Sequence, residues 1–166
     1  MEITFENQPL AGIAADVLIL AVAESSGEPN LPAGLDKAVQ SWAGELYASG
    51  EFKGKLYELA TLHKPAGLKA KRLLLVGTGK ENKSADDLRF AVGAAIRNTK
   101  KYSPAVAAVW IGDANPQSVA AVTEGAIFGN WESDCYKSTQ DRKPIGSCSI
   151  VVGESSGDLE RSGAHV

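Results

Sequence analysis

Residues 72–80 constrain the fold of this chain more than any other stretch. They read Arg-Leu-Leu-Leu-Val-Gly-Thr-Gly-Lys, so four apolar residues in a row stand between a charge and two glycines. Such a run predicts a strand that is buried on both faces, because a half-exposed strand would alternate with polar residues. Alternate residues should face opposite layers of the core: Leu73 and Leu75 on one side, Leu74 and Val76 on the other. A glycine-rich turn and a helix follow, which makes half of a βαβ unit.

Five further segments have the composition of strands. Residues 16–22 and 105–111 are apolar on both faces and are predicted to be buried in a sheet. Residues 3–5 alternate and are predicted as a short edge strand, and residues 148–152 as the final strand. Residues 56–62 are predicted as a strand too, with a helix as the alternative.

Three segments have the periodicity of amphipathic helices. Their apolar stripes are Leu35, Ala38, Val39, Trp42 and Leu46 in the first, Leu88, Ala91, Val92, Ala95 and Ile96 in the second, and Val119, Val122, Ala126 and Ile127 in the third. Ser84 followed by Asp87 predicts a capping box at the start of the second helix. Asn115 before Pro116 predicts a cap with proline at the first helical position, and this helix should end near Trp131.

The order of elements is therefore β-β-α-β-β-α-β-α-β. This order predicts an α/β fold, a three-layer α/β/α sandwich with a mixed, mostly parallel sheet. A chain of 166 residues is long enough for one such domain with its own core. We expect the domain to occupy residues 1–152. Residues 153–166 are polar and rich in glycine and serine, and they are predicted to form a tail or the start of a linker.

Charge and cysteine content narrow the classes of function. A net charge of −3 and a pI near 5.4 argue against nucleic-acid binding. Two cysteines, Cys135 and Cys148, are too few for a disulfide framework. The first residues lack a signal segment, and the longest apolar run, residues 17–23, is far shorter than a membrane span. We therefore expect a soluble, cytoplasmic protein.

The glycine-rich turn at Gly77, Gly79 and Lys80 is the first candidate for a ligand site. A phosphate loop needs a longer span between its glycines, so that successive backbone N–H groups can wrap around an anion. A dinucleotide fingerprint needs a third glycine at the start of the helix, where this chain has Glu-Asn-Lys. Neither pattern is met, so the turn is predicted to be structural and to hold no cofactor.

Side chains for metal or acid–base chemistry do not cluster in the sequence. The two histidines, His63 and His165, lie in a predicted strand and in the tail, and no metal-binding spacing of His or Cys occurs. Asp86 and Asp87 are adjacent, but neighbours on a helix point about 100° apart and do not converge on one ion. Their simpler role is to stabilise the N-terminus of the second helix.

Nucleophiles lack a catalytic context as well. Cys135 stands beside Asp134 without a base nearby in the sequence, and Cys148 is predicted to be a core residue. The serine pairs at 25–26 and 155–156 lie in loops, outside any nucleophile-elbow motif. From the residues alone we predict no catalytic, cofactor-binding or metal-binding site.

Tryptophans and helical glycines are interpreted as packing residues. Trp42, Trp110 and Trp131 each lie on a periodic apolar element, which favours a place in the core. Gly125 and Gly129 are four residues apart on the third helix. Each costs about 1 kcal/mol of helix propensity relative to alanine, so they predict a close approach to a neighbouring helix.

The third helix and the segment after it resemble the N-terminal domain of the leucyl (cytosol) aminopeptidase family. In that family a helix of the type E-G-A-x-L-G-x-Y runs into a polar segment with a tyrosine and a lysine. The matching residues here are Glu124, Gly125, Ala126, Gly129, Trp131, Tyr136 and Lys137. The strand and turn at 72–80 and the Phe-Lys-Gly-Lys segment at 52–55 match the same domain. The resemblance covers about residues 12–152.

The resemblance implies a non-catalytic accessory or assembly domain of a metal-dependent exopeptidase. The family's enzymes remove N-terminal residues, often leucine, with two divalent metal ions that a C-terminal catalytic domain holds. Its N-T-D-A-E-G-R-type metal-binding run does not occur in this sequence. No catalytic, cofactor-binding or metal-binding residue is therefore carried over, and this chain should be inactive by itself. The expected partners are the catalytic domain and neighbouring subunits of a hexamer.

A macro-like binding module for an ADP-ribose-type ligand is the alternative function. The family's N-terminal domain has a macro-domain-like fold, and residues 16–20 and 34–44 resemble macro domains themselves. ADP-ribose-binding macro domains carry an N-A-A-N-like turn and a run of glycines, from which residues 21–24 and 31–34 depart. Some bacterial members of the family also bind DNA. Here that would require a local basic face, from Lys64, Lys69, Lys71 and Arg72.

Overall fold

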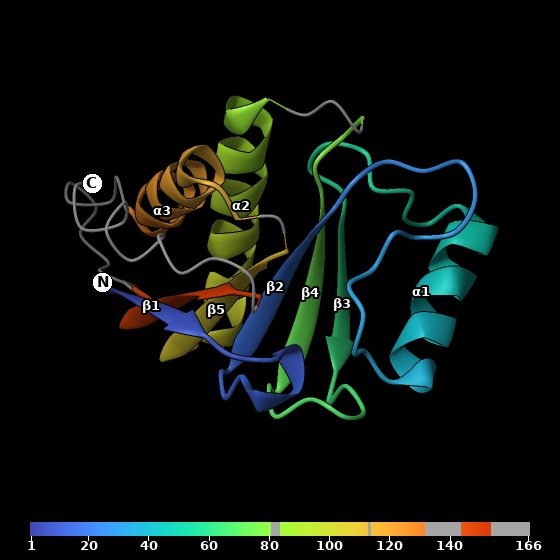
Figure 1. Ribbon diagram of the computed structural model, residues 1–166, viewed down its shortest axis with the longest axis horizontal. Coiled ribbons are helices and arrows are strands. Elements are labelled where there is room, and N and C mark those ends of the chain that lie inside the picture. The colour runs from blue at the N-terminus through green and yellow to red at the C-terminus, as the bar shows by residue number, and fades with distance from the viewer. Residues whose placement is uncertain (81–83, 113, 132–143, 154–166) are drawn as a thin grey trace.

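A computed structural model gives the positions of residues 1–80, 84–112, 114–131 and 144–153 (Figure 1). The strands are β1 (Glu2–Asn7), β2 (Val17–Val22), β3 (Leu59–His63), β4 (Arg72–Gly77), β5 (Val106–Ile111) and β6 (Ser147–Val152). The α-helices are α1 (Lys37–Ser49), α2 (Ala85–Thr99) and α3 (Pro116–Asn130). Two short 3-10 helices cover Leu10–Gly12 and Lys100–Tyr102. The predicted order of strands and helices is confirmed.

The six strands form one sheet in the order β1-β6-β5-β2-β4-β3. Every neighbouring pair is parallel except β3 and β4, which are antiparallel. The sheet is therefore mixed and mostly parallel, as predicted. β2 and β4 lie inside the sheet and β1 lies at one edge, which agrees with the burial expected from their sequences.

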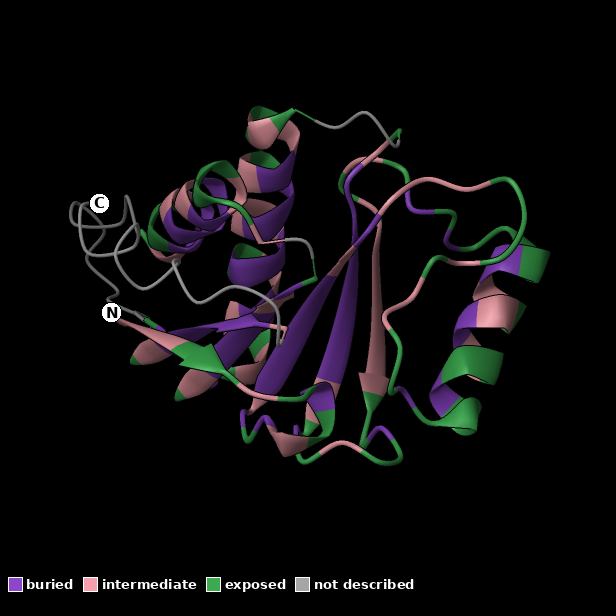
Figure 2. Ribbon diagram, in the orientation of Figure 1, coloured by how far each residue is buried: buried purple, intermediate pink, exposed green. Residues whose placement is uncertain are grey.

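Helices cover both faces of the sheet, which gives the predicted three layers. Helices α2 and α3 lie on one face and α1 lies on the other (Figure 1). Leu74 and Val76 of β4 pack in the α2/α3 layer, whereas Leu73 and Leu75 pack in the α1 layer. All four are fully buried, and the central strands are buried along their length (Figure 2). The alternation predicted for this strand is confirmed.

Helices α2 and α3 pack closely because glycines line their contact. A Cβ atom at Gly125 would lie 2.4 Å from the carbonyl oxygen of Arg89. One at Gly129 would lie 2.5 Å from the carbonyl oxygen of Gly93. No side chain larger than hydrogen fits at either position without moving the two backbones apart. The packing role predicted for these two glycines is confirmed.

Both predicted helix caps are present. The hydroxyl of Ser84 accepts from the backbone N–H of Asp87, whose carboxylate accepts from the N–H of Ser84. Asn115 and Ser118 form the equivalent pair at the start of α3, with Pro116 as the first helical residue. Each cap satisfies backbone donors that have no partner inside the helix.

Three details of the predicted elements are wrong. β3 begins at Leu59 rather than 56, because Tyr57 has a left-handed backbone (φ 71°) that interrupts an extended strand. In α1 the buried residues are Val39, Ala43 and Tyr47, whereas Ala38 is exposed in the first turn. The buried stripe is therefore centred on residues four apart, one position C-terminal to the predicted Ala38 and Trp42.

The end of α3 is the third difference. The apolar periodicity predicts Ile127 and Trp131 in the core, but both are exposed, by 45% and 69%. Helix α3 buries the side that carries its glycines against α2, so these two residues face away from the sheet. The polar excursion predicted at 132–143 and residues 154–166 of the predicted tail lie outside the described residues.

Candidate functional site

A cleft of about 590 Å³ lies at the carboxyl ends of the parallel strands. Open α/β sheets bind ligands at this edge, because the connections there bring strand ends and helix N-termini together. Its walls come from β2, β5, the loop at 30–32 and the first turns of α2 and α3. The cleft is therefore the candidate site for a small ligand within the described part of the chain.

The side chains of the cleft are neutral. Its lining residues are Ala21, Ala23, Asn30, Leu31, Pro32, Ser84, Ala85, Leu88, Val109, Trp110, Ile111, Gly112, Asn115, Gln117, Ser118 and Val122. The lining thus offers apolar surface, one tryptophan ring, three amides and two hydroxyls. None of these side chains titrates near neutral pH, so the described lining can bind a ligand but supplies no general acid or base.

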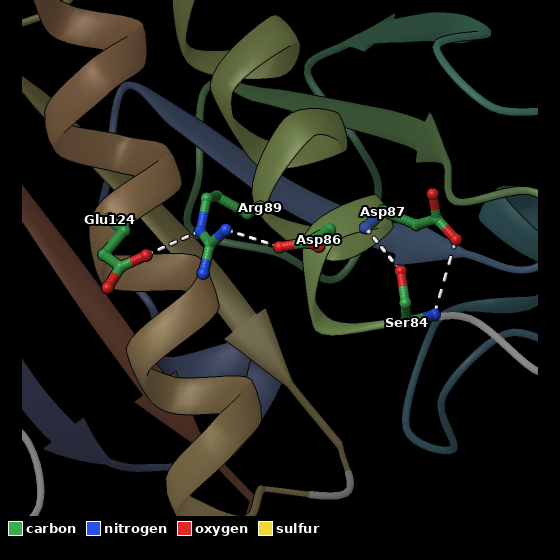
Figure 3. A network of polar contacts seen from close by, with 5 residues as sticks. All are labelled: Ser84, Asp86, Asp87, Arg89 and Glu124. Atoms are coloured by element: carbon green, nitrogen blue, oxygen red, sulfur yellow. Dashed lines mark hydrogen bonds and ion pairs between the residues drawn. The ribbon is translucent and has the colours of Figure 1, made fainter.

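The two carboxylates beside the cleft, Asp86 and Asp87, make contacts that stabilise the start of helix α2 (Figure 3). Asp87 caps α2 together with Ser84, and Asp86 forms an ion pair with Arg89. Arg89 also pairs with Glu124 of α3, and so ties the two helices together. The structural role predicted for Asp86 and Asp87 fits these contacts. Their negative charges at the N-terminus of α2 oppose an anionic ligand there.

The backbone of the turn after β4 is in contact with other loops of the protein. A Cβ atom at Gly77 would lie 1.9 Å from the carbonyl oxygen of Lys55, so that loop presses directly on the strand end. The N–H of Thr78 donates to Val22, and the N–H of Gly79 donates to Gly54. Gly79 has φ 79°, a conformation that glycine adopts without strain. These contacts use the backbone groups that a phosphate loop would point at an anion, which supports the structural interpretation.

The remaining candidates do not meet in one place. His63 is exposed at the end of β3, and its ring stands nearly perpendicular to that of Tyr102. Cys148 lies in the core, where burial raises the pKa of its thiol to about 12. Ser25 accepts from the backbone N–H of Gly27 in an open loop. Cys135, His165 and the serines at 155–156 lie outside the described residues.

Metal-binding side chains do not gather within the described ranges. No group of three or more His, Cys, Asp or Glu residues there is close enough to hold an ion. The described residues therefore do not fit a two-metal site of the kind that the resemblance implies for the family's catalytic domain. Across the same ranges, no helix has the length and apolar character needed to cross a membrane.

The four residues of the predicted basic face lie around the β3–β4 connection, but two of them have other contacts. Lys71 donates to Asp16 at 2.6 Å, and this bond holds the pKa of the Asp16 carboxyl below its ordinary value. The guanidinium of Arg72 stacks on the ring of Tyr102, 4.5 Å from its centroid. Lys64 and Lys69 are exposed.

The cleft was not predicted from the sequence. Its lining comes from five segments that only the sheet order brings together. One sequence feature could have indicated the cleft: Asn30 and Asn115 lie in the segments that follow β2 and β5. The carboxyl ends of adjacent parallel strands share one edge of the sheet, so these two segments meet there.

Fold and site together define an α/β domain of macro-like architecture whose cleft is neutral. A solved macrodomain, that of Thermus aquaticus DarG, has the same fold, with a TM-score of 0.56 at 9% identity over 92% of this chain. The model of the cytosol aminopeptidase family, N-terminal domain, matches residues 19–140. The chain therefore belongs to the cytosol aminopeptidase family and corresponds to its N-terminal domain.

Individual relatives agree with this assignment. The probable cytosol aminopeptidase of Solibacter usitatus is 36% identical over 157 residues, which cover 93% of this chain and 30% of the relative. That of Koribacter versatilis is 34% identical, over 92% of this chain and 34% of the relative. A mutant of tomato leucine aminopeptidase superposes with a TM-score of 0.76 at 20% identity, over 99% of this chain and 35% of its own. This chain spans about a third of the length of these proteins.

Proposed function

We propose that this chain is a non-catalytic accessory and assembly domain of a metal-dependent leucyl aminopeptidase. The observation that carries the proposal is the family match: the chain aligns along nearly its whole length with 30–34% of two probable cytosol aminopeptidases. The neutral lining of the cleft is consistent with it. In this proposal, peptide hydrolysis belongs to the rest of the enzyme.

The proposal extends to the partners of the domain. The catalytic domain of the enzyme would hold two divalent metal ions and would release N-terminal residues from peptides. Neighbouring subunits of a hexamer would be further partners. The names of the relatives support a cytoplasmic location. Neither membrane nor nucleic acid is among the proposed partners, the latter because the net charge of the chain is −3.

Two measurements test this function. The purified chain should not release p-nitroaniline from leucine p-nitroanilide with Mn²⁺, Zn²⁺ or Co²⁺ added. A chimeric enzyme, in which this chain replaces the matching segment of the Solibacter usitatus protein, should hydrolyse the same substrate if that parent does. Metal-dependent turnover by the chain alone, or an inactive chimera beside an active parent, would contradict the proposal.

Binding of an ADP-ribose-type ligand is the second candidate, and the cleft of about 590 Å³ is the observation that favours it. The volume suits a nucleotide-sized molecule, and the ring of Trp110 could stack on a base. Asp86 and Asp87 oppose a pyrophosphate at the N-terminus of α2. Calorimetric titration with ADP-ribose separates the two functions: we expect no binding tighter than high micromolar, and tighter binding would favour this alternative.

A further inference from the structure

The last two turns of α3 expose three large apolar side chains. Ile127, Phe128 and Trp131 are exposed by 45%, 63% and 69%. With Glu124 they stand at positions i, i+3, i+4 and i+7, so they share one stripe of the helix. We call Ile127, Phe128 and Trp131 the α3 patch. Exposed apolar residues are ordinary when scattered, but neighbouring aromatic and aliphatic side chains on one stripe are typical of an interface.

Helix α3 carries little charge for a helix at the surface of the protein. Glu124 is the only charged residue among its fifteen, whereas α2, of the same length, has four. One side of α3 packs against α2 and the sheet through Gly125 and Gly129. Near its C-terminus the outward side carries Ile127 and Phe128 in place of charged residues. The outward side of α3 therefore has the character of a contact surface.

The α3 patch is held on a fixed backbone. The side chain of Asn130 accepts from the N–H of Ile145 at 2.9 Å and donates to its carbonyl oxygen at 3.3 Å. Lys100 donates to the carbonyl oxygen of Asn130 at 2.8 Å. The N–H of Trp131 closes the helix on the carbonyl oxygens of Ile127 and Phe128. A preordered surface loses less entropy when a partner binds, which favours docking.

We propose that the α3 patch is the surface on which the catalytic portion of the aminopeptidase docks. This inference rests on the proposed function. The match to this chain covers 30% of the Solibacter usitatus relative and 34% of the Koribacter versatilis relative, so roughly two thirds of each polypeptide lies outside the match and is tethered to it. Tethering gives that portion a high effective concentration at any surface it fits.

Two other possible occupants of the α3 patch are less suitable. Residues 132–143 follow the patch directly, but six of these twelve residues are charged, and Cys135 and Tyr136 are their only apolar side chains. A second copy of this chain has no tether, so it would have to bind through the patch alone. Three side chains make a small contact compared with the roughly 20–30 residues a side of a stable interface. The catalytic portion can contact the patch as one part of a larger surface.

Covalent footprinting with a carbene reagent, read by mass spectrometry, tests the proposal in the free chain and in the active chimera with the Solibacter usitatus enzyme. Phe128 and Trp131 should label strongly in the free chain. In the chimera their labelling should fall by about fivefold or more, as for side chains that move into an interface core. Phe90 on α2, exposed by 53%, is the internal control and should label equally in both.

Other outcomes overturn the proposal in recognisable ways. If the patch is labelled equally in both proteins and the chimera is active, the docking proposal is wrong and the proposed function is retained. If the α3 patch is protected in the free chain at every concentration, other residues of the same chain cover it. Protection that appears only as the free chain is concentrated assigns it to a second copy. If the chimera is inactive and the parent is active, the proposed function is contradicted, and so is the docking proposal that rests on it.

Substitutions in the chimera give an independent readout. Phe128→Ser and Trp131→Ser remove exposed side chains, so the domain itself should fold, which circular dichroism of the free variants checks. Each should speed release of the domain by limited trypsin digestion by about tenfold, the effect of losing one central interface residue. Phe90→Ser is the matched control and should leave the rate unchanged. Equal rates for all three variants would overturn the proposal.

Discussion

Replacing Gly129 by alanine should destabilise this protein, although alanine is the better helix former. In a helix interior alanine is favoured over glycine by about 1 kcal/mol. At Gly129, however, the new Cβ would lie 2.5 Å from the carbonyl oxygen of Gly93 and 2.9 Å from the Cβ of Ile96. Overpacking costs about 1–3 kcal/mol, and the upper end applies here because one obstacle is backbone. The net loss in the free energy of unfolding should be about 2 kcal/mol.

Gly44→Ala in α1 is the matched control, because nothing lies within 4 Å of a Cβ placed there. It should gain most of the roughly 1 kcal/mol of helix propensity without a clash. Urea denaturation, followed by circular dichroism, measures both changes as shifts of the midpoint at constant slope. The two variants should move Tm in opposite directions, by about 2–4 °C for each kcal/mol. A Gly129→Ala protein that is stabilised like Gly44→Ala would refute the close packing of α2 and α3.

Three further predictions follow from buried or paired groups. The Cys148 thiol, whose pKa burial raises to about 12, should react with iodoacetamide at pH 8 only as fast as the protein unfolds; rapid alkylation of this residue in the native state, read by peptide mass spectrometry, would contradict its place in the core. Asp16 has a pKa lowered chiefly by its hydrogen bond from Lys71, so its contribution to stability is present above the unfolded pKa of about 4 and is lost as pH falls through the lower folded value. Urea midpoints should therefore drop less steeply in acid for Asp16→Asn than for the wild type, and parallel pH profiles would show that the pair is unimportant. Gly77→Ala would place a Cβ 1.9 Å from the carbonyl oxygen of Lys55, so it should cost about 3 kcal/mol or more by urea denaturation, and a neutral result would disprove the contact.

The strands and the three helices could be predicted because their signals are local. In β4, four consecutive apolar residues are buried on alternate faces, and one segment of sequence contains all the information needed. The caps at Ser84 and Asn115 are equally local, since each needs only a partner three residues ahead. Gly129 predicted a close approach through its cost to the helix, although the sequence did not identify α2 as its neighbour.

The missed features depend on contacts between distant segments. Trp131 lies at the correct spacing for the apolar stripe of α3, but the helix buries the side that carries its glycines, and periodicity alone does not choose between two apolar sides. Ala38 is exposed because the face of α1 toward the sheet is centred on Val39, Ala43 and Tyr47, and periodicity alone does not fix which edge of an apolar stripe meets the core. Tyr57 ends the predicted strand early through a left-handed backbone that a bulky residue seldom adopts.

The cleft and the α3 patch bear differently on the two proposed functions. Parallel strands bring their carboxyl ends and the following helix N-termini to one edge whatever the sequence, so the cleft is a consequence of topology. Which ligand the cleft could bind depends on its side chains, and the lining side chains are neutral. Asp86 and Asp87, in the first turn of α2, would repel an anionic ligand there. Exposed large apolar side chains gather instead at the far end of α3, as Ile127, Phe128 and Trp131. Because function resides in side chains rather than in the fold, the distribution of these residues favours a docking domain over a nucleotide-binding one.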